Sequence, residues 1–206
     1  MKLTTMTQIT VDGVVQGNGH ATDDERRDGF ERDGWAMGVF DDETGAFITQ
    51  TFRRADAFLF GRRTYEIFAD TWGSNEQMRA HPIGVALNKA PKYVASNTIT
   101  DPHWAGTTVL SGDLAAAVGE LKAQPGGELQ VHGSGALVRW LLEHELVDEL
   151  TLLIVPVVLG QGTRLFPEAG LDVALDLVDS RADTKGVTIQ VYRPAGRPHY
   201  HPARPA

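Results

Sequence analysis

Two glycine-containing turns in the sequence combine residue types that can hold a phosphate group. Residues 61–64 (Gly-Arg-Arg-Thr) and 132–135 (His-Gly-Ser-Gly) each follow a short apolar run and precede a segment with helical spacing of apolar residues. Backbone N–H groups at a helix N-terminus attract anions, glycine lets a ligand approach the backbone, and arginine adds charge. Alone, the first turn also fits an ordinary helix start with solvated arginines. Two such turns together favour a phosphate-bearing ligand lying across the ends of several strands.

A third glycine-containing turn and two aspartates also lie close to the ends of predicted strands or helices. Residues 160–164 (Gly-Gln-Gly-Thr-Arg) form either another loop at the same edge or a plain turn. Asp12 ends the first predicted strand, and Asp70 follows the helix after Gly61. An aspartate at such an edge can hold a polar substrate group or relay a proton, whereas in a turn it commonly caps the backbone. Both interpretations stay open for each residue.

Other kinds of catalytic site lack their signatures. The third glycine of a dinucleotide fingerprint is replaced by Val138, and no glycine is followed by lysine and then serine or threonine. The seven histidines show no metal-ligand spacing, and neither Ser111 nor Ser134 lies in a G-x-S-x-G turn. Because the chain has no cysteine, thiolate zinc sites, cysteine nucleophiles and disulfides are excluded. We therefore predict no metal site and no hydrolase chemistry.

The elements that must position these turns alternate between strand and helix. The first strand, from about residue 3, ends at the Asp12-Gly13 turn signal. Further strands are predicted at 57–60, 92–95, 107–110, 129–132 and 149–158, and helices near 47–55, 64–69, 113–124 and 137–142. This order predicts right-handed crossovers and a largely parallel sheet, followed by an antiparallel hairpin of 175–178 and 187–192. The stretch 17–42 is predicted to be a long loop that folds over something, because it contains Phe30, Trp35 and Phe40.

Composition restricts the partners and the location of the protein. With 206 residues, 42% of them hydrophobic, the chain suits one domain, predicted to span 1–193, with a flexible tail at 194–206 that carries four prolines. A formal net charge of −8 repels nucleic acid and anionic membranes. The longest apolar run, 150–159, is too short to span a bilayer, and the N-terminus lacks the apolar segment of a signal peptide. We expect a cytoplasmic protein with a small-molecule substrate, no nucleic-acid partner and no membrane partner.

Read together, these segments resemble the dihydrofolate-reductase-like family, and within it the reductase domain of the bifunctional riboflavin-biosynthesis deaminase/reductase. The similar stretches follow the family's order up to about Arg193: 9–15, 55–66, 92–96, 131–135, 146–150 and 156–166. The resemblance implies a three-layer α/β/α fold with a mostly parallel mixed sheet, and NADPH crossing the strand ends. It places cofactor contacts at Gly61, Arg62, Arg63, Thr64, Ser96, Asn97, Gly133, Ser134, Gly135 and Ala136.

The chain departs from this family at two positions that bear on its ligands. Many relatives carry arginine after Ser96, but Asn97 stands here, which weakens the inference of NADPH over NADH because arginine would recognise the 2′-phosphate. Asp70-Thr71-Trp72 lies where the riboflavin reductase domain has an acidic pair, so the riboflavin intermediate itself is in doubt as substrate. We predict Asp12 and Asp70 as catalytic groups and Trp35 and Trp72 as lining the substrate pocket.

The leading hypothesis is a homodimeric, nicotinamide-dependent reductase of a small heterocyclic or carbonyl substrate. Dimerisation rests on the family resemblance, with 150–159 as a candidate surface. Two alternatives remain: a nucleotide-binding or sensing protein without turnover, and a reductase that uses a flavin or deazaflavin on the same fold. A loop at 17–42 that closes on a ligand would favour the enzyme. A cleft filled by Phe30, Trp35 or Phe40 would favour the sensing protein.

Overall fold

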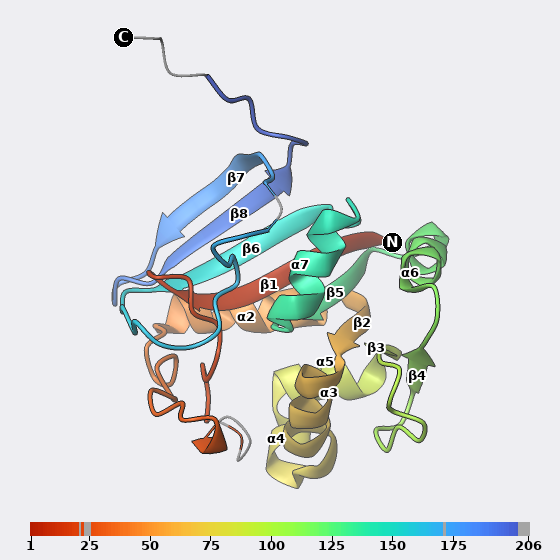
Figure 1. The fold of residues 1–206 in the computed structure, drawn as a ribbon. Coiled ribbons are helices and arrows are strands. Elements are labelled where there is room, and N and C mark those ends of the chain that lie inside the picture. Colours follow the sequence, from red (N-terminus) through yellow and green to blue (C-terminus); the bar gives the residue numbers. More distant parts are fainter. Residues whose placement is uncertain (21, 23–25, 171, 202–206) are drawn as a thin grey trace, which may run out of the picture.

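An eight-stranded mixed sheet forms the centre of the computed structural model, which describes residues 1–20, 22, 26–170 and 172–201 (Figure 1). The strand order is β4-β3-β2-β5-β1-β6-β8-β7. The pairs among β1 to β6 are parallel, whereas β8 pairs antiparallel with both β6 and β7. The strands are β1 (Lys2–Thr10), β2 (Ala55–Gly61), β3 (Lys92–Ala95), β4 (Thr107–Leu110), β5 (Glu128–His132), β6 (Glu149–Val155), β7 (Leu175–Ala182) and β8 (Thr188–Pro194). The predicted parallel sheet and C-terminal hairpin are confirmed.

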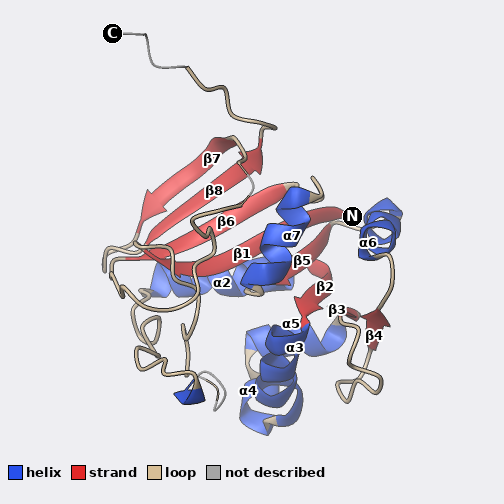
Figure 2. Cartoon of the chain, viewed as in Figure 1, coloured by secondary structure: helices blue, strands red, loops and turns tan. Residues whose placement is uncertain are grey.

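Helices cover both faces of this sheet (Figure 2). The upper face, defined here as the one bearing α6 (Leu114–Ala123) and α7 (Gly135–Glu143), buries Leu3, Leu59 and Leu129. The lower face bears α2 (Asp42–Arg53) and α5 (Pro82–Lys89), and a second cluster there includes Met6 and Phe58. The remaining helices are α3 (Arg62–Phe68), the π-helical turn η1 (Ala69–Ser74) and α4 (Glu76–Ala80). The arrangement is the predicted α/β/α sandwich of the dihydrofolate-reductase-like fold.

Several helix boundaries differ from the sequence-based prediction. The helix α2 begins at Asp42 rather than near residue 47, because the Asp41 carboxylate accepts a hydrogen bond from Thr44 N and caps it. Analysis of the sequence missed η1, α4 and α5. The last two begin at side-chain caps, Asn75 for α4 and His81 for α5, rather than at a long apolar repeat.

The first part of the apolar run 150–159 belongs to the interior strand β6. Strand β6 lies between β1 and β8, and Leu150, Leu152 and Leu153 are buried. The strand ends at Val155, before Pro156, which has no N–H to donate to a sheet. Both edges of β6 are paired within one chain, whereas Val158, beyond the end of the strand, is 68% exposed, and the expectation that the run forms a dimer surface stays a prediction.

The described part of the predicted tail contacts the domain. Ala195 N donates to Ala174 O, and Arg197 pairs with Asp172. Positions 202–206 lie outside the described residues, so the flexible tail and the boundary at 193 stay predictions. None of the helices in the described ranges is long and apolar enough to cross a membrane.

Candidate functional site

The two predicted phosphate-binding turns lie side by side in the structure. They follow β2 and β5, which pair in parallel, so both turns leave the same edge of the sheet. Gly61 N donates a hydrogen bond to Ser134 Oγ at 3.0 Å. A Cβ atom added to Gly133 would lie 3.7 Å from Thr64 Cγ2. The topology therefore unites residues 61–64 and 133–136 in one site.

Both helices that begin here lack a side-chain cap. Gly61 is the N-cap of α3 and Ser134 is the N-cap of α7, and neither makes a capping hydrogen bond from its side chain. Ser134 has φ +57°, a left-handed conformation, and its hydroxyl is instead occupied by Gly61 N. The first N–H groups of two helices consequently remain available to an anion at one place.

Glycine is needed at these turns for two different reasons. At Gly61, a Cβ atom would lie only 3.3 Å from Ser134 Oγ, in the space between the turns. At Gly133, the φ of +63° is one that residues with a side chain rarely adopt. A side chain at position 61 would therefore crowd Ser134, and one at position 133 would strain the turn.

The two arginines beside the turns differ in their partners. Arg62 Nη1 lies 3.3 Å from Glu66 Oε1, an ion pair along α3. Arg63 is exposed and makes no ion pair with any residue that the structure describes. Among the residues after β3, Ser96 Oγ accepts hydrogen bonds from Thr98 N and Ile99 N, and Asn97 is exposed. Of the two arginines, Arg63 is therefore the one whose charge is unpaired among the described residues.

Asp12 is held by backbone donors from the loop after β6. Its carboxylate accepts hydrogen bonds from Leu159 N at 3.1 Å, Gly160 N at 2.7 Å and Thr10 Oγ1 at 2.6 Å. These hydrogen bonds, above all the one from Thr10, lower the Asp12 pKa to about 2. An aspartate that stays ionised at neutral pH is unsuited to donate a proton. The catalytic role of Asp12 stays a prediction, and its contacts favour holding the loop in place.

The third glycine turn, 160–164, packs against the segment after β1. Val15 N donates to Thr163 O, Leu165 N donates to Gly13 O, and Arg164 Nε donates to Asp12 O. Phe30, from the long predicted loop, is buried against Val14 beside this turn. The turn thus joins 12–16 and the 17–42 segment, and its direct contact with a ligand remains a prediction.

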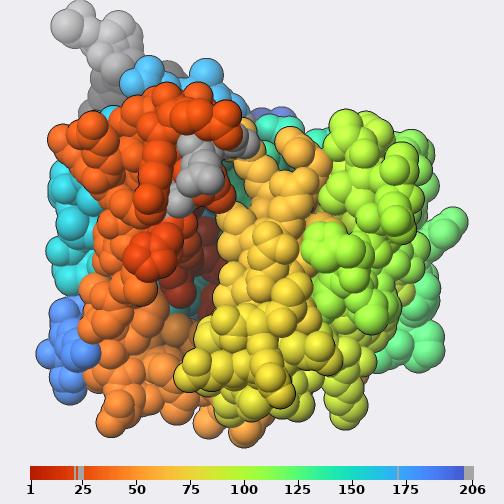
Figure 3. Space-filling model, turned by 90° about the horizontal axis from the view of Figure 1, so that it is seen from below, coloured from red at the N-terminus to blue at the C-terminus, as the bar shows by residue number. Residues whose placement is uncertain are grey.

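Asp70 and the two predicted pocket tryptophans lie on the lower side of the sheet. Asp70 is exposed in η1, with Oδ1 3.7 Å from His103 Nε2, and it makes no contact with Asp12 among the interactions of the described residues. Trp35 and Trp72 both pack, partly buried, against the lower cluster. Figure 3 shows a hollow between the orange segment before and within α2 and the gold segment of α3, with the dark red of the N-terminal strand at its floor.

Two polar residues of the lower face were missed by the sequence analysis as site candidates. His132, the last residue of β5, is buried and stacks on Phe52 of α2, with 3.8 Å between ring centroids. Gln8 of β1 accepts a hydrogen bond from Asn18 Nδ2. Both residues lie on the lower face, near the ends of their strands. The alternation of side chains along a strand could have assigned them to that face from the sequence. From the sequence, His132 was considered as a metal ligand and as part of the 132–135 turn, but not as a residue of the substrate site.

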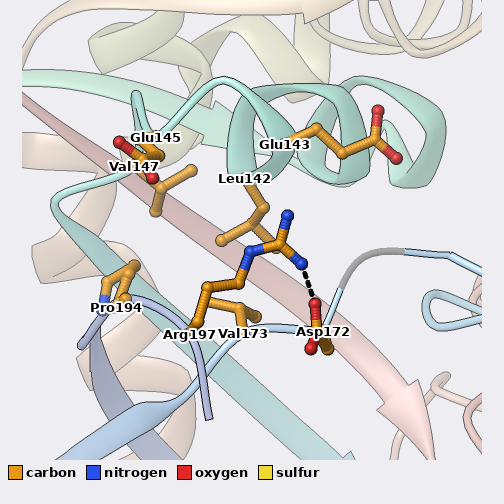
Figure 4. Close-up of a pocket in the computed structure, with 9 residues that line it drawn as sticks. Leu142, Glu143, Glu145, Val147, Asp172, Val173, Pro194 and Arg197 are labelled. Atoms are coloured by element: carbon orange, nitrogen blue, oxygen red, sulfur yellow. Dashed lines mark hydrogen bonds and ion pairs between the residues drawn. The ribbon is translucent and has the colours of Figure 1, made fainter.

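A separate cavity of about 280 Å³ lies at the other end of α7 (Figure 4). It is lined by apolar and charged side chains, including Leu142, Glu143 and the Arg197–Asp172 ion pair. None of the predicted site residues borders it. The carboxyl edge of the sheet, rather than this cavity, gathers the residues with the chemistry described above.

The chain belongs to the RibD C-terminal domain family, whose sequence pattern matches residues 1–189. It is 26% identical over 185 residues to the uncharacterized protein YyaP of Bacillus subtilis, covering 89% of this chain and 90% of the relative. A second uncharacterized protein of that organism, YwjB, is 27% identical over 157 residues, covering 75% and 83%.

Solved structures show the same fold at lower sequence identity. A putative riboflavin biosynthesis protein from Shewanella has a TM-score of 0.69 at 20% identity, covering 94% of this chain and 99% of the other. A pyrimidine reductase-like protein from Corynebacterium diphtheriae has a TM-score of 0.62 at 13% identity, covering 94% and 91%. Dihydrofolate reductase from Enterococcus faecalis, solved as a complex with NADP(H), has a TM-score of 0.60 at 14% identity, covering 94% and 96%. Family and fold are those of reductases.

Proposed function

We propose that the protein is an NADPH-dependent reductase that transfers a hydride to a small heterocyclic or carbonyl substrate. The observation that carries the proposal is the hydrogen bond from Gly61 N to Ser134 Oγ, which brings the uncapped N-termini of α3 and α7 together. A dinucleotide carries several phosphate oxygens, and two adjacent helix N-termini suit such a ligand. Membership of a reductase family supports the same chemistry.

The residues of the carboxyl edge fit the cofactor that the family implies. The turn at Gly133, Ser134, Gly135 and Ala136 would face the pyrophosphate, with Thr64 as a further donor. The nicotinamide ring supplies the hydride, so the protein's task is to orient it, exclude water and present the substrate. In this proposal Ser96 and Asn97 lie near the adenosine end.

The choice of NADPH over NADH depends on which cation meets the 2′-phosphate. No arginine follows Ser96, but Arg63 is exposed and without an ion-pair partner in the described part of the chain. A single unpaired arginine can bind a phosphate through two parallel hydrogen bonds. Arg63 therefore supports NADPH as the preferred cofactor, and NADH remains the alternative to compare.

The hollow on the lower side is the proposed substrate site. Trp35 and Trp72 pack against the lower cluster and, in this proposal, would supply flat apolar walls for a heterocycle. Phe30 is buried in a small cluster with Val14 and Leu159, against which Trp35 also packs.

Titration with several cofactors tests the proposal directly. Calorimetry with NADPH, NADH and reduced flavin at fixed salt should give the tightest binding for NADPH. If only the flavin binds, the flavin-dependent alternative replaces the proposal. If NADPH binds but no pterin, pyrimidine or carbonyl compound oxidises it, the sensing alternative does.

The variant Gly133→Asp locates the binding site. It should abolish NADPH binding, because its carboxylate would stand where the pyrophosphate is proposed to lie. Gly196→Asp is a matched control, since Gly196 has φ +79° and open space around it but lies far from the turns in the sequence, beside Ala174. Both folded variants should be titrated by calorimetry, and equal affinities would remove the Gly133 turn from the cofactor site.

The proposal includes a homodimer in the cytoplasm, where nicotinamide cofactors are available. The exposed Leu177 of edge strand β7 is a better candidate contact than the buried β6, because an open strand edge can pair with another chain. Sedimentation equilibrium should give the mass of two chains, and the mass of one chain at all concentrations would contradict the dimer.

A further inference from the structure

The cavity at the C-terminal end of α7 has an apolar lining that the proposed reductase site does not use (Figure 4). Leu142 and Val147 are buried, and Val173 and Pro194 are partly buried, and all four line the cavity. Its volume of about 280 Å³ is close to the lower end of the range for small-molecule sites. The cavity can therefore take the apolar part of a small ligand.

The chain that follows β8 forms one wall of this cavity. Ala174 N donates a hydrogen bond to Gly196 O at 2.8 Å, which extends the pairing of the C-terminal hairpin. The Asp172 carboxylate accepts one hydrogen bond from Arg197 on Oδ1 and one from the Tyr200 hydroxyl on Oδ2. The charge of Arg197 is consequently neutralised by Asp172, and both oxygens of that carboxylate are occupied.

Two carboxylates on the α7 side of the cavity are unpaired. Glu143 is the last residue of α7 and Glu145 follows two positions later, and both line the cavity. Neither makes an ion pair or a side-chain hydrogen bond with a residue that the structure describes. The C-terminus of a helix carries the negative end of the helix dipole, so these carboxylates add to a potential that is already negative. This side of the cavity therefore favours a positive charge.

The charges of the lining separate a cationic ligand from other classes. An anion would meet the unpaired carboxylates of Glu143 and Glu145, while the positive charge of Arg197 is already paired. A metal ion is not favoured, since no three His, Asp or Glu side chains in the described ranges lie together where they could hold one. An uncharged molecule would gain nothing from the two carboxylates. An organic cation with an apolar body satisfies both parts of the cavity.

We propose that this cavity binds a small amphipathic cation, of the class of primary alkylammonium ions. Its apolar chain packs on Leu142, Val147 and Val173, and its ammonium group pairs with Glu143 and Glu145. An ammonium group has three N–H donors, which is enough to serve both carboxylates. The site lies at the opposite end of α7 from the proposed pyrophosphate turn, so it does not depend on the reductase function.

Titration with three compounds that share one six-carbon chain tests the class of ligand. At pH 7 hexylammonium is a cation, hexanol is neutral and hexanoate is an anion. Calorimetry at low salt should show hexylammonium binding about five-fold more tightly than hexanol, and hexanoate binding more weakly than either. Equal affinities for hexylammonium and hexanoate, or no binding of hexylammonium, overturn the proposal.

Methyl NMR locates the bound hexylammonium. The methyl signals of Leu142, Val147 and Val173 should shift during the titration, because these groups line the cavity. Shifts confined to methyl groups elsewhere in the protein would place the ligand in another site and contradict the proposal.

Variants of the two carboxylates test the ion pairs. Glu143→Gln and Glu145→Gln should each weaken hexylammonium binding about three-fold, and the double variant about ten-fold. Glu120→Gln is the matched control, because Glu120 is exposed on α6 and its substitution removes the same charge at a distant position. An equal loss in all three single variants would mean that the net charge of −8 attracts the cation without a site, which overturns the proposal.

Val173→Phe tests the apolar part of the cavity. The larger side chain should occupy part of the space and weaken hexylammonium binding about ten-fold, and an unchanged affinity in the folded variant contradicts the proposed packing. Amide spectra of each variant establish that it is folded before affinities are compared. Glu143 and Glu145 are exposed, so the carboxylate variants decide the question even if Val173→Phe does not fold.

Discussion

The two arginine side chains at the start of α3 differ in their neighbours. Arg62 is paired with Glu66, whereas Arg63 has no ion-pair partner in the described residues. Both residues are arginine in the sequence. They differ only in the direction in which each side chain leaves the helix. That difference gives a prediction at this single position.

We expect Arg63→Ala to weaken NADPH binding about ten-fold or more, because a hydrogen bond to a charged group contributes roughly 1.5–3 kcal/mol. Arg62→Ala is the matched control and should weaken binding much less, since its guanidinium is already shared with Glu66. Calorimetric titration of both variants at the same ionic strength provides the comparison. Equal losses of NADPH affinity in the two variants would show that the positive charge of Arg63 acts at long range rather than through a direct contact with the cofactor.

The loop after β6 depends on one carboxylate from the end of β1. Asp12 accepts hydrogen bonds from Leu159 N and Gly160 N, and its backbone carbonyl accepts one from Arg164. Two segments nearly 150 residues apart in the chain are joined in this way. The position of this loop therefore depends on Asp12.

Asp12→Asn should lower the free energy of unfolding by about 1–3 kcal/mol, because an NH₂ donor replaces one of the two carboxylate oxygens that accept hydrogen bonds from Thr10, Leu159 and Gly160. Urea unfolding at pH 7 measures this change. Asp70→Asn, at a side chain that is 80% exposed, should change stability by less than about 0.5 kcal/mol. A stability loss confined to Asp70→Asn would contradict the assignment of Asp12 to the loop.

Stability of the whole molecule depends on pH through the buried His132. The folded-state pKa of about 3 lies below the ordinary value of 6.5, so between these values the unfolded chain binds a proton that the folded chain does not. The contribution of His132 to the stability of the folded state is therefore fully present above pH 6.5 and is lost as the pH falls toward 3. A loss of stability with falling pH is the direction expected of a histidine that is buried in its neutral form.

We predict that this one group makes the wild type lose about 1.4 kcal/mol for each pH unit below about 6. Urea unfolding of wild type and His132→Phe at pH 7, 6 and 5 gives the two slopes, and the variant's slope should be shallower. The exposed histidines and the carboxylates are common to both proteins and cancel in the difference. Parallel slopes would mean that His132 is accessible to protons in the folded state.

The sequence by itself determined the strand order along the chain, the C-terminal hairpin and the two turns with helix-starting glycines. These features depend on local periodicity and on backbone conformations that glycine permits, and both are visible in neighbouring residues. Strands β3 and β4 were predicted at their observed bounds, 92–95 and 107–110. The family resemblance depended on the same local motifs.

Only the tertiary structure decided which of those residues meet. The hydrogen bond from Gly61 to Ser134, the burial of β6 and the bonds from 159–160 to Asp12 all join segments distant in the chain. His132 illustrates the physical reason: its tautomer depends on Gln130, whose amide is oriented by Thr51 of α2, 79 residues away in the sequence. A side chain's partners, and so its protonation and its chemistry, are fixed by packing rather than by residue type.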